Sequence, residues 1–344
     1  METHVVAAYR TEIPNDGTEG NNLPGREQLF EKLRQRGLRP VISIMAESAF
    51  TSDGVQVYET VDGEHVDKGV IPHNNVGVIL NRLDQSFKPE KLPEGYKSPA
   101  RLNENATRSL VFRKNRTHDE VLHPLGLAMP TALAGTEDDV AAFLQTESAL
   151  RYVVKPNSGT NSNNIHMLDH AGVVKHFEAK PDDYGAYIVQ TAHDFTRSFP
   201  STVRAYDRSS QESFTSWSTS GVTKELRVYG FHSPEQTAVF PIARAMKDGD
   251  QWFFVDPYSL PERVIEGTRL AIAKAAAISG AAALYGTVDF GYGSDGQNAS
   301  DWHAIEMNAR MPYLLGYDKH PGIADLLRDR LADQIMETAD ARAC

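Results

Sequence analysis

Residues 285–290 read Tyr-Gly-Thr-Val-Asp-Phe, and residues 302–310 read Trp-His-Ala-Ile-Glu-Met-Asn-Ala-Arg, with a stretch rich in Gly, Asp, Asn and Ser between them. Two short apolar-rich segments joined by such a turn predict a β-hairpin. Glu306 and Asn308 are two positions apart, so a strand would present both on one face, with Asp289 on the neighbouring strand. Two carboxylates and an amide oxygen are hard ligands of the kind that Mg²⁺ prefers. The hairpin alone predicts either a magnesium site or ordinary surface acids.

A second motif occupies residues 151–165, Arg-Tyr-Val-Val-Lys-Pro-Asn-Ser-Gly-Thr-Asn-Ser-Asn-Asn-Ile. Its apolar strand ends at Lys155, where a charge is costly unless it meets an anion. The loop of small polar residues around Gly159 can fold its backbone N–H groups and hydroxyls over phosphates as a lid. The lysine precedes the loop, so the motif is not a P-loop. A polar hairpin loop with a solvated lysine is the alternative.

Together the two motifs resemble the ATP-grasp superfamily, particularly the carboxylate–amine ligases around D-alanine–D-alanine ligase and glutathione synthetase. The matching residues are Lys155-Pro156, the loop at 157–164, Asp289 and Glu306-Met307-Asn308, and the likeness spans about residues 100–320. In the family the Asp and the Glu-x-Asn hold a pair of Mg²⁺ ions. The resemblance therefore implies an α/β (α+β) chain with the ATP-grasp fold, with ATP and two Mg²⁺ ions as cofactors and with Mn²⁺ able to replace Mg²⁺.

Phosphate-binding residues follow from the resemblance. The lid would cover the phosphates with small residues, namely Ser158, Gly159, Thr160, Asn161 and Ser162. Lys114 lies on a segment whose pattern predicts a helix from Asn105 to Leu125, and in the family a lysine at this place reaches the α-phosphate. The register departs by about one residue, so Arg116 is the alternative ligand. A solvated helix lysine is the interpretation without a site.

The hinge between the two halves of the fold corresponds to residues 187–193, Tyr-Ile-Val-Gln-Thr-Ala-His. Backbone groups of Gln190, Thr191 and Ala192 are expected to pair with the adenine edge, so side-chain identity would matter little there. The family usually has Glu where this chain has Gln190. Glu225 is the candidate for binding the ribose hydroxyls.

Three arginines are expected to face the reacting groups. Arg227 would hold the γ-phosphate or the acyl-phosphate by a bidentate contact. Arg244 alternates out of an apolar run that resembles a strand lining the site, and a surface arginine is the equally weighted alternative. Arg310 would face the carboxylate or the acyl-phosphate oxyanion by resemblance. The family has Pro-Gly after Glu-x-Asn, whereas this chain has Ala-Arg-Met-Pro-Tyr at 309–313, which predicts a different acceptor pocket.

The resemblance implies an enzyme, an ADP-producing ligase that forms an amide or peptide bond through an acyl-phosphate. Its partners would be a small-molecule carboxylate and an amino-acid-like amine, and a homodimer is expected on family grounds. Three alternatives stay open: a kinase or phosphotransferase on the same fold, a ligase that modifies a peptide or protein, and a binding protein with a relic ATP site. The mechanism needs no protein nucleophile, in keeping with a single cysteine, Cys344.

Composition agrees with such an enzyme. The chain has 344 residues, of which 40% are apolar and 24% charged, values typical of a soluble globular protein with two or three subdomains. A net charge of −11 argues against a nucleic-acid partner, because phosphate backbones favour clustered Lys and Arg. No apolar run approaches membrane-spanning length and the N-terminus lacks the pattern of a secretion signal, so we expect a cytoplasmic protein without a membrane partner.

We expect an N-terminal α/β domain at 1–100, a central subdomain with the phosphate lid at 101–188, and a C-terminal subdomain with the metal site at 189–344. The stretch 195–223 is longer than the family pattern requires and is rich in Ser, Thr and Arg. We interpret it as an insertion that faces the substrate.

The N-terminal domain should contain a parallel sheet. Apolar strands at 4–9 and 41–45 flank an amphipathic helix at 25–37, and this strand–helix–strand order is typical of parallel pairing. Residues 55–70 predict a hairpin with an Asp-Gly turn. Towards the C-terminus, an Ala-rich stretch at 267–284 predicts a helix that packs closely on a sheet.

Overall fold

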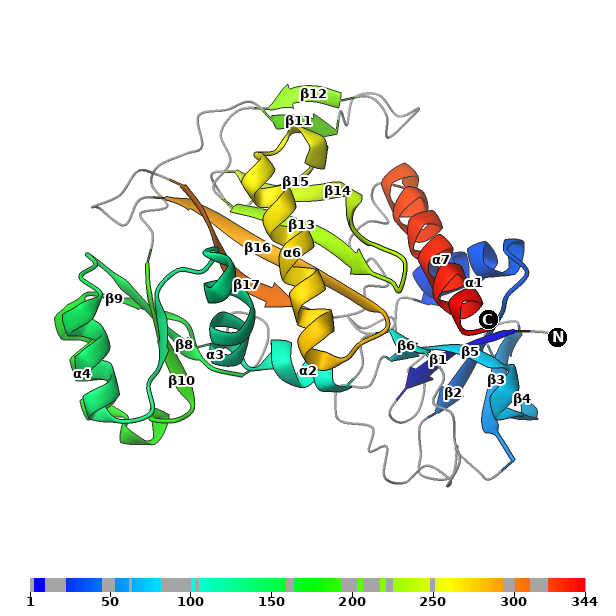
Figure 1. Cartoon of the computed structure of the whole chain (residues 1–344), viewed down its shortest axis with the longest axis horizontal. Coiled ribbons are helices and arrows are strands. Elements are labelled where there is room, and N and C mark those ends of the chain that lie inside the picture. The colour runs from blue at the N-terminus through cyan, green and yellow to red at the C-terminus, as the bar shows by residue number, and fades with distance from the viewer. Residues whose placement is uncertain are drawn as a thin grey trace.

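The fold is that of a computed structural model of the chain (Figure 1). The structure describes residues 3–9, 23–44, 53–61, 64–81, 100–102, 105–158, 164–192, 203–206, 217–220, 225–247, 251–293, 301–309 and 321–343. Three β-sheets and the helices packed on them account for most of these residues, so the predicted mixed α/β class is confirmed.

The N-terminal sheet has its strands in the order β4-β3-β2-β1-β5-β6. In chain order its elements are β1 (His4–Tyr9), α1 (Leu23–Gln35), β2 (Arg39–Ile44), β3 (Val55–Val61), β4 (Glu64–Ile71), η2 (His73–Asn75), β5 (Val76–Asn81) and β6 (Ala100–Leu102). β1 pairs in parallel with β2 and β5, and β5 pairs in parallel with β6. The predicted parallel arrangement is therefore confirmed, as is the hairpin of β3 and β4.

The segment between the first two sheets is helical but broken. It contains α2 (Asn105–Phe112), α3 (Lys114–Arg116), η4 (Thr117–Leu122) and η5 (His123–Leu125). The prediction of one continuous helix is wrong at Arg113, whose backbone is extended with φ −95° and ψ 105°. The cause is tertiary, because Arg113 forms a backbone bridge with Ser158 at the start of the lid. Gly126 ends the segment with a φ of 65°, a left-handed conformation that suits glycine.

The central sheet has its strands in the order β7-β10-β8-β9. Its elements are β7 (Thr131–Leu133), α4 (Glu137–Thr146), β8 (Tyr152–Pro156), β9 (His166–Leu168), α5 (His170–Ala179), η6 (Pro181–Asp183) and β10 (Tyr187–Thr191). Thr136 and Asp169 cap the first turns of α4 and α5 with their side chains. Phe143, Val154 and Phe177 join helices and strands in a small core. The lid connects β8 to β9, so this sheet carries the loop expected to cover phosphates.

The C-terminal sheet is antiparallel, with strand order β12-β11-β15-β14-β13-β16-β17. Its elements are β11 (Val203–Tyr206), β12 (Trp217–Ser220), β13 (Glu225–His232), β14 (Thr237–Lys247), β15 (Gln251–Val255), η7 (Pro257–Ser259), α6 (Glu262–Ser279), β16 (Leu284–Gly293) and β17 (Asp301–Asn308). β16 and β17 form the predicted hairpin. The Ala-rich helix, predicted at 267–284, instead begins at Glu262 and ends at Ser279. β11 and β12 belong to the 195–223 stretch, whose other residues lie outside the described part.

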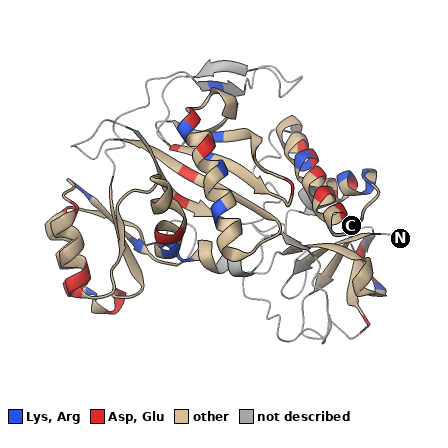
Figure 2. Cartoon of the chain, in the orientation of Figure 1, with Lys and Arg blue, Asp and Glu red and all other residues tan. Residues whose placement is uncertain are grey.

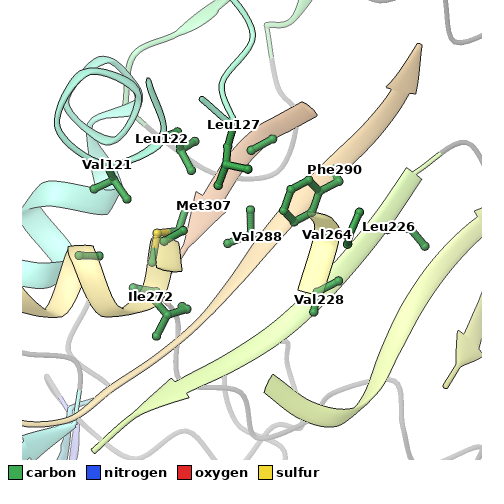
Figure 3. Packing of buried hydrophobic residues seen from close by; sticks show 14 of the residues in the cluster. Val121, Leu122, Leu127, Leu226, Val228, Val264, Ile272, Val288, Phe290 and Met307 are labelled. Atoms are coloured by element: carbon green, nitrogen blue, oxygen red, sulfur yellow. The ribbon is translucent and has the colours of Figure 1, made fainter. Parts of the chain in front are cut away.

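Helix α6 covers one face of the C-terminal sheet (Figures 1 and 3). Val228, Val288 and Met307, from three neighbouring strands, pack there with Ile272 of the helix in one apolar cluster. Gly286 permits this close approach, because a Cβ at that position would lie 2.9 Å from both Ile272 and the Asn308 carbonyl oxygen. This face is therefore a closed core, and it holds β16 and β17 at fixed positions.

Helix α7 (Pro321–Ala343) ties the C-terminal sheet to the N-terminal domain. Lys32 Nζ lies 2.9 Å from Asp325 Oδ1 of α7. Arg36 Nη2, just after α1, lies 2.7 Å from Asp333 Oδ1. Leu327 of α7 belongs to a core cluster that includes residues of both sheets. This packing covers the apolar end of one face of the C-terminal sheet, the face that does not contact α6. None of the described helices, α7 included, is long and apolar enough to cross a membrane.

The three sheets follow one another along the chain in the order of the three expected domains. β6 ends at Leu102 and β10 at Thr191, close to the expected boundaries at 100 and 188. We propose the division into domains at 1–100, 101–188 and 189–344 on this order, with α7 returning to the first domain.

Candidate nucleotide and metal site

Four charged residues pair with one another in a row across adjacent strands of the C-terminal sheet. Figure 2 marks the charged positions along the chain by colour. Arg227 on β13 lies opposite Arg244 on β14 and opposite Asp289 on β16. Asp289 in turn lies opposite Glu306 on β17. Directly opposed residues share one face of a sheet. Because Val228, Val288 and Met307, the sequence neighbours of three of these residues, pack under α6, the row lies on the face opposite α6.

Arg227 and Asp289 form a bidentate ion pair at the centre of this row. Arg227 Nε and Nη2 donate to the two carboxylate oxygens of Asp289 at 2.7 and 2.6 Å. Burial disfavours both charges. It raises the pKa of the Asp289 carboxyl, and the hydrogen bonds from Arg227 oppose that rise. Burial likewise acts against the Arg227 guanidinium, but its hydrogen bond to Asp289 raises the pKa of Arg227. The pair fixes the orientation of the Arg227 guanidinium within the row.

Glu306 and Asn308 meet beside Asp289. Asn308 Nδ2 donates to Glu306 Oε1 at 3.0 Å and approaches Asp289 Oδ2 at 3.5 Å. The strand pairing is irregular between Asp289 and Phe290, where a bulge changes the direction of neighbouring side chains. The structure thus brings together the three residues that the sequence suggests as metal ligands.

This set of groups fits a divalent cation. Asp289 and Glu306 are direct cross-strand neighbours, and like charges so placed repel each other unless a cation lies between them. Each carboxylate oxygen has two lone pairs, so Asp289 keeps acceptor capacity while it pairs with Arg227. Half a turn of the Asn308 amide would direct its oxygen to the same point. Among the described residues no three His, Cys, Asp or Glu side chains form a metal cluster, so the set depends on this amide.

Lys155 is buried at the end of β8, with 4% of its surface exposed. Burial lowers the pKa of Lys155 to about 8, against the opposing charge of Glu306. Its Nζ donates to Gln190 Oε1 at 3.0 Å, and Gln190 Nε2 donates to Thr131 Oγ1 at 2.8 Å. The Gln190 side chain thus positions the lysine, which differs from the expectation that side-chain identity matters little at this hinge.

Lys114 is held beside the lid by the backbone. Its N–H donates to the Asn157 carbonyl at 2.8 Å, and the next N–H donates to Asn157 Oδ1 at 3.0 Å. Burial lowers the pKa of Lys114, and the nearby Glu306 carboxylate opposes this effect. Arg116, the alternative ligand, instead pairs with Glu120 at 2.6 Å. Lys114, unlike Arg116, lines the pocket described below.

The remaining nucleotide-binding candidates are placed as follows. Glu225 begins β13 two residues before Arg227, and burial, with the charge of Asp289, raises its pKa to about 7. At the hinge the Thr191 N–H donates to the Pro130 carbonyl and the Ala192 N–H to the Arg151 carbonyl. Both N–H groups are therefore hydrogen-bonded within the protein, and the pairing of the hinge backbone with adenine stays a prediction. Their carbonyl groups remain candidates.

The catalytic and lid candidates are only partly described. The Arg244 guanidinium carbon lies 6.0 Å from the centre of the Phe254 ring, which orients the side chain within the row. Ser158 is exposed. Gly159, Thr160, Asn161, Ser162 and Arg310 lie outside the described residues.

A small, partly open pocket lies where the broken helical segment, the central sheet and β17 meet. Its lining comes from the broken helical segment, the central sheet and β17: Val111, Lys114, Thr117, His118, Leu122, Thr131, Ile188, Gln190, Ala304, Ile305, Glu306 and Met307. Two of these lining residues, Thr131 and His118, are not predicted from the sequence. No local pattern marks either residue, because only the tertiary packing of three segments brings them to the pocket.

No family model matches the sequence, and no curated protein matches it. Solved structures, by contrast, are similar over almost the whole chain. The ATP-grasp ligase PsnB, complexed with a minimal precursor, is 13% identical over 98% of this chain and 99% of its own, with a TM-score of 0.55.

Two further structures extend the likeness. The VanG D-Ala:D-Ser ligase from Enterococcus faecalis is 11% identical over 98% of this chain and 100% of its own, with a TM-score of 0.60. The macrocyclase MdnC from Microcystis aeruginosa, bound to the precursor peptide MdnA, is 13% identical over 96% of this chain and 100% of its own, with a TM-score of 0.55. The chain therefore resembles ATP-grasp ligases in structure and has the ATP-grasp fold.

Proposed function

We propose that the chain is an ATP-dependent carboxylate–amine ligase that forms an amide or peptide bond through an acyl-phosphate and releases ADP and phosphate. The observation that carries this proposal is the cross-strand row, in which two guanidiniums adjoin two carboxylates beside the pocket lined by Lys114 and Glu306. Acyl-phosphate chemistry builds negative charge on phosphoryl and carbonyl oxygens, and such a row supplies cationic groups and metal ligands together. The ATP-grasp fold supports the same conclusion.

In this proposal the nucleotide phosphates bind between the two lysines. Lys155 is buried and Lys114 is half-buried, and bound phosphates would place anionic groups against both ammonium groups. The lid residues at 158–162 would cover the phosphates from above. Glu225 would accept hydrogen bonds from the ribose hydroxyls, and the hinge at 190–192 would contribute its carbonyl groups to the base.

The metal ligands would be Asp289, Glu306 and Asn308. Mg²⁺, or Mn²⁺ in its place, would supply positive charge for the phosphates, and we propose two ions. These three residues, on β16 and β17 beside Arg227, would hold the ions. Arg227 can serve the phosphate only by sharing its fork or by loosening its pair with Asp289, which lies at 2.6 Å.

The reaction would proceed in two displacements. A substrate carboxylate oxygen bonds to the γ-phosphorus while the bond from that phosphorus to the β-phosphate oxygen breaks, and ADP leaves. An amine nitrogen then bonds to the carbonyl carbon, the bond from that carbon to the phosphate oxygen breaks, and the departing phosphate takes the amine proton. Arg227 and Arg244 would neutralise the oxyanions of both steps, with Arg310 as a third candidate.

We propose a small-molecule carboxylate and an amino-acid-like amine as substrates, in a cytoplasmic homodimer supplied with ATP. A peptide or protein substrate is the second candidate within the same class. Two of the similar structures, those of PsnB and MdnC, contain a precursor, which favours keeping this second candidate. The β11–β12 pair adds an extra edge to the sheet and would form one wall of a larger acceptor site.

The proposal is tested by phosphate release with Mg-ATP and a matrix of carboxylates, amines and short peptides. We expect ADP and phosphate to appear only when a carboxylate and an amine are both present, with the amide found by mass spectrometry. Glu306→Gln serves as the inactive control. ADP formed with one substrate and a stable phosphorylated product would instead establish a kinase. Nucleotide binding without turnover in any mixture would favour the relic site.

A further inference from the structure

Asn157, the residue that follows β8, holds the start of the helical segment that carries Lys114. Its carbonyl accepts from the Lys114 N–H at 2.8 Å, and its side-chain Oδ1 accepts from the Asn115 N–H at 3.0 Å. Its own N–H donates to the carbonyl of Ala186, just before β10, at 2.8 Å. Asn157 therefore joins three segments that are distant from one another in the sequence.

The helical turn that begins at Lys114 has no side-chain cap of its own. Arg113, at the N-cap position, has an extended backbone and makes no capping hydrogen bond with its side chain. The N–H groups of a first helical turn have no partner within the helix and need one from outside it. Asn is among the residues preferred for capping, and here it comes from 42 positions along the chain from Asn115. Because its partner is an N–H donor, the oxygen of the Asn157 amide faces Asn115.

This cap sets the position of Lys114 relative to Lys155. Lys155 is two residues before Asn157, and its Nζ donates to Gln190 Oε1 of β10 at 3.0 Å. Burial is the main cause that lowers the pKa of Lys155, and the charge of Lys114 lowers it further, so the two ammonium groups lie within electrostatic reach of each other. Like charges repel when no anion lies between them. The hydrogen bonds of Asn157 hold the two lysine-bearing segments together despite this repulsion.

We infer that Asn157 is a positioning residue for the proposed reaction: by capping the helix at Asn115, its side chain places the Lys114 ammonium group so that Lys114 and Lys155 contact the same chain of phosphates. The inference rests on the proposed function, because it requires that both lysines bind nucleotide phosphates. In this role the Asn157 side chain acts through Lys114 and not by its own contact with the nucleotide.

A double-mutant cycle measures whether Asn157 acts through Lys114. Calorimetry with Mg-ADP compares the wild type, Asn157→Ala, Lys114→Ala and the double variant. Asn157→Ala removes the side-chain cap only, because the carbonyl that accepts from Lys114 and the backbone bridge between Arg113 and Ser158 are retained. Thermal unfolding verifies that each variant is folded.

Thr136→Ala is the matched control. Thr136 caps α4 in the same subdomain by accepting from the Asp139 N–H at 3.2 Å, and it does not line the pocket. Thr136→Ala and Asn157→Ala therefore each lose one side-chain cap, and both should lower the unfolding temperature by similar amounts. Only the second of these caps belongs to a helix that carries a phosphate-binding lysine in the proposed function.

A measurement on the wild type needs no variant. The N–H groups of a first helical turn normally exchange quickly with solvent, because no intrahelical partner protects them. In the protein without nucleotide, the Asn115 N–H should instead exchange slowly, since Asn157 Oδ1 accepts from it. Fast exchange of this N–H would overturn the inference, because the cap would then not persist in solution.

We expect Asn157→Ala to weaken Mg-ADP binding about fivefold, the worth of one cap, and Thr136→Ala to leave it unchanged. On the Lys114→Ala background, Asn157→Ala should cause no further loss. The same fivefold loss on that background, an equal loss in Thr136→Ala, or wild-type affinity in either Asn157→Ala or Lys114→Ala would overturn the inference while leaving the ligase proposal intact. A wild type that binds no nucleotide would overturn the ligase proposal itself.

Discussion

The two faces of the C-terminal sheet are built from alternating residues of the same strands and have opposite character. Under α6, Val228, Val288 and Met307 are buried in an apolar core (Figure 3). On the other face their sequence neighbours Arg227, Asp289 and Glu306 form a charged row. Because side chains alternate along a strand, each of these core residues is the sequence neighbour of a residue in the charged row.

The charged face is the more informative one. Apolar side chains under a helix only have to fill space, whereas buried charges lower the stability of a fold unless they have partners. Asp289 is 2% exposed and its bidentate partner Arg227 comes from the adjacent strand. A row of this kind is difficult to explain by stability alone, so it indicates function.

The largest effect should come from removing one carboxylate of the charged face. Glu306→Gln or Asp289→Asn is expected to reduce turnover by about a thousandfold or more, because each removes an anionic ligand of the proposed metal site. Steady-state ADP formation at saturating Mg²⁺ measures this, with circular dichroism to show that the fold is retained. Turnover near that of the wild type in either variant would rule out the metal assignment.

The matched change on the opposite face should have the reverse signature. Ile272→Ala, a change in α6 outside the pocket lining, is expected to lower the free energy of unfolding by about 2–5 kcal/mol, because it leaves a cavity in the core between α6 and the sheet. Turnover per folded molecule should change little, since Glu306 is still held by the β16 pairing. Denaturant titration and active-site-normalised rates give the two values. A thousandfold loss of turnover in folded Ile272→Ala would show that the faces are not separable.

Several of these features could be predicted from sequence and others could not. The β16–β17 hairpin and the lysine at the end of β8 follow local alternation and turn composition, which is why they were predictable. The interruption of the helix at Arg113 depends on the backbone bridge between Arg113 and Ser158. The hydrogen bond from Lys155 to Gln190 joins side chains of two different strands. Such features come from contacts between distant segments, and no local periodicity encodes them.

The next effect in size concerns Lys155, the buried cation at the end of β8 in the central sheet. Lys155→Ala is expected to weaken ADP binding about thirtyfold, because a charged hydrogen bond to phosphate is lost. Acyl-phosphate formation should nearly cease. Calorimetry with Mg-ADP measures the binding. An unchanged affinity would make Lys155 a structural lysine that only pairs with Gln190.

A smaller effect is expected from pH. Burial lowers the pKa of Lys155 to about 8 from an ordinary value of 10.5. Above pH 8 the free folded protein loses this proton while the unfolded chain keeps it up to about pH 10.5, so the contribution of Lys155 to stability rises with pH over this window. ADP binding needs the ammonium form and should weaken about tenfold by pH 9.

Gln190→Glu sharpens this pH test. A carboxylate placed where Gln190 Oε1 now accepts from Lys155 Nζ at 3.0 Å would raise the pKa of the lysine. The decline in ADP affinity should then begin at higher pH than in the wild type. Calorimetry across pH 7 to 10 compares the two proteins. Coincident pH profiles would show that Lys155 does not control nucleotide binding.

The most direct test of the charged face is the electron paramagnetic resonance of Mn²⁺ with ADP and the protein. The account predicts protein-bound Mn²⁺ when ADP is present, loss of that signal in Glu306→Gln at equal ADP saturation, and its retention in Ile272→Ala. Bound Mn²⁺ of equal amount in Glu306→Gln and the wild type would contradict the account, because the metal would then be held by the nucleotide or by residues outside the row.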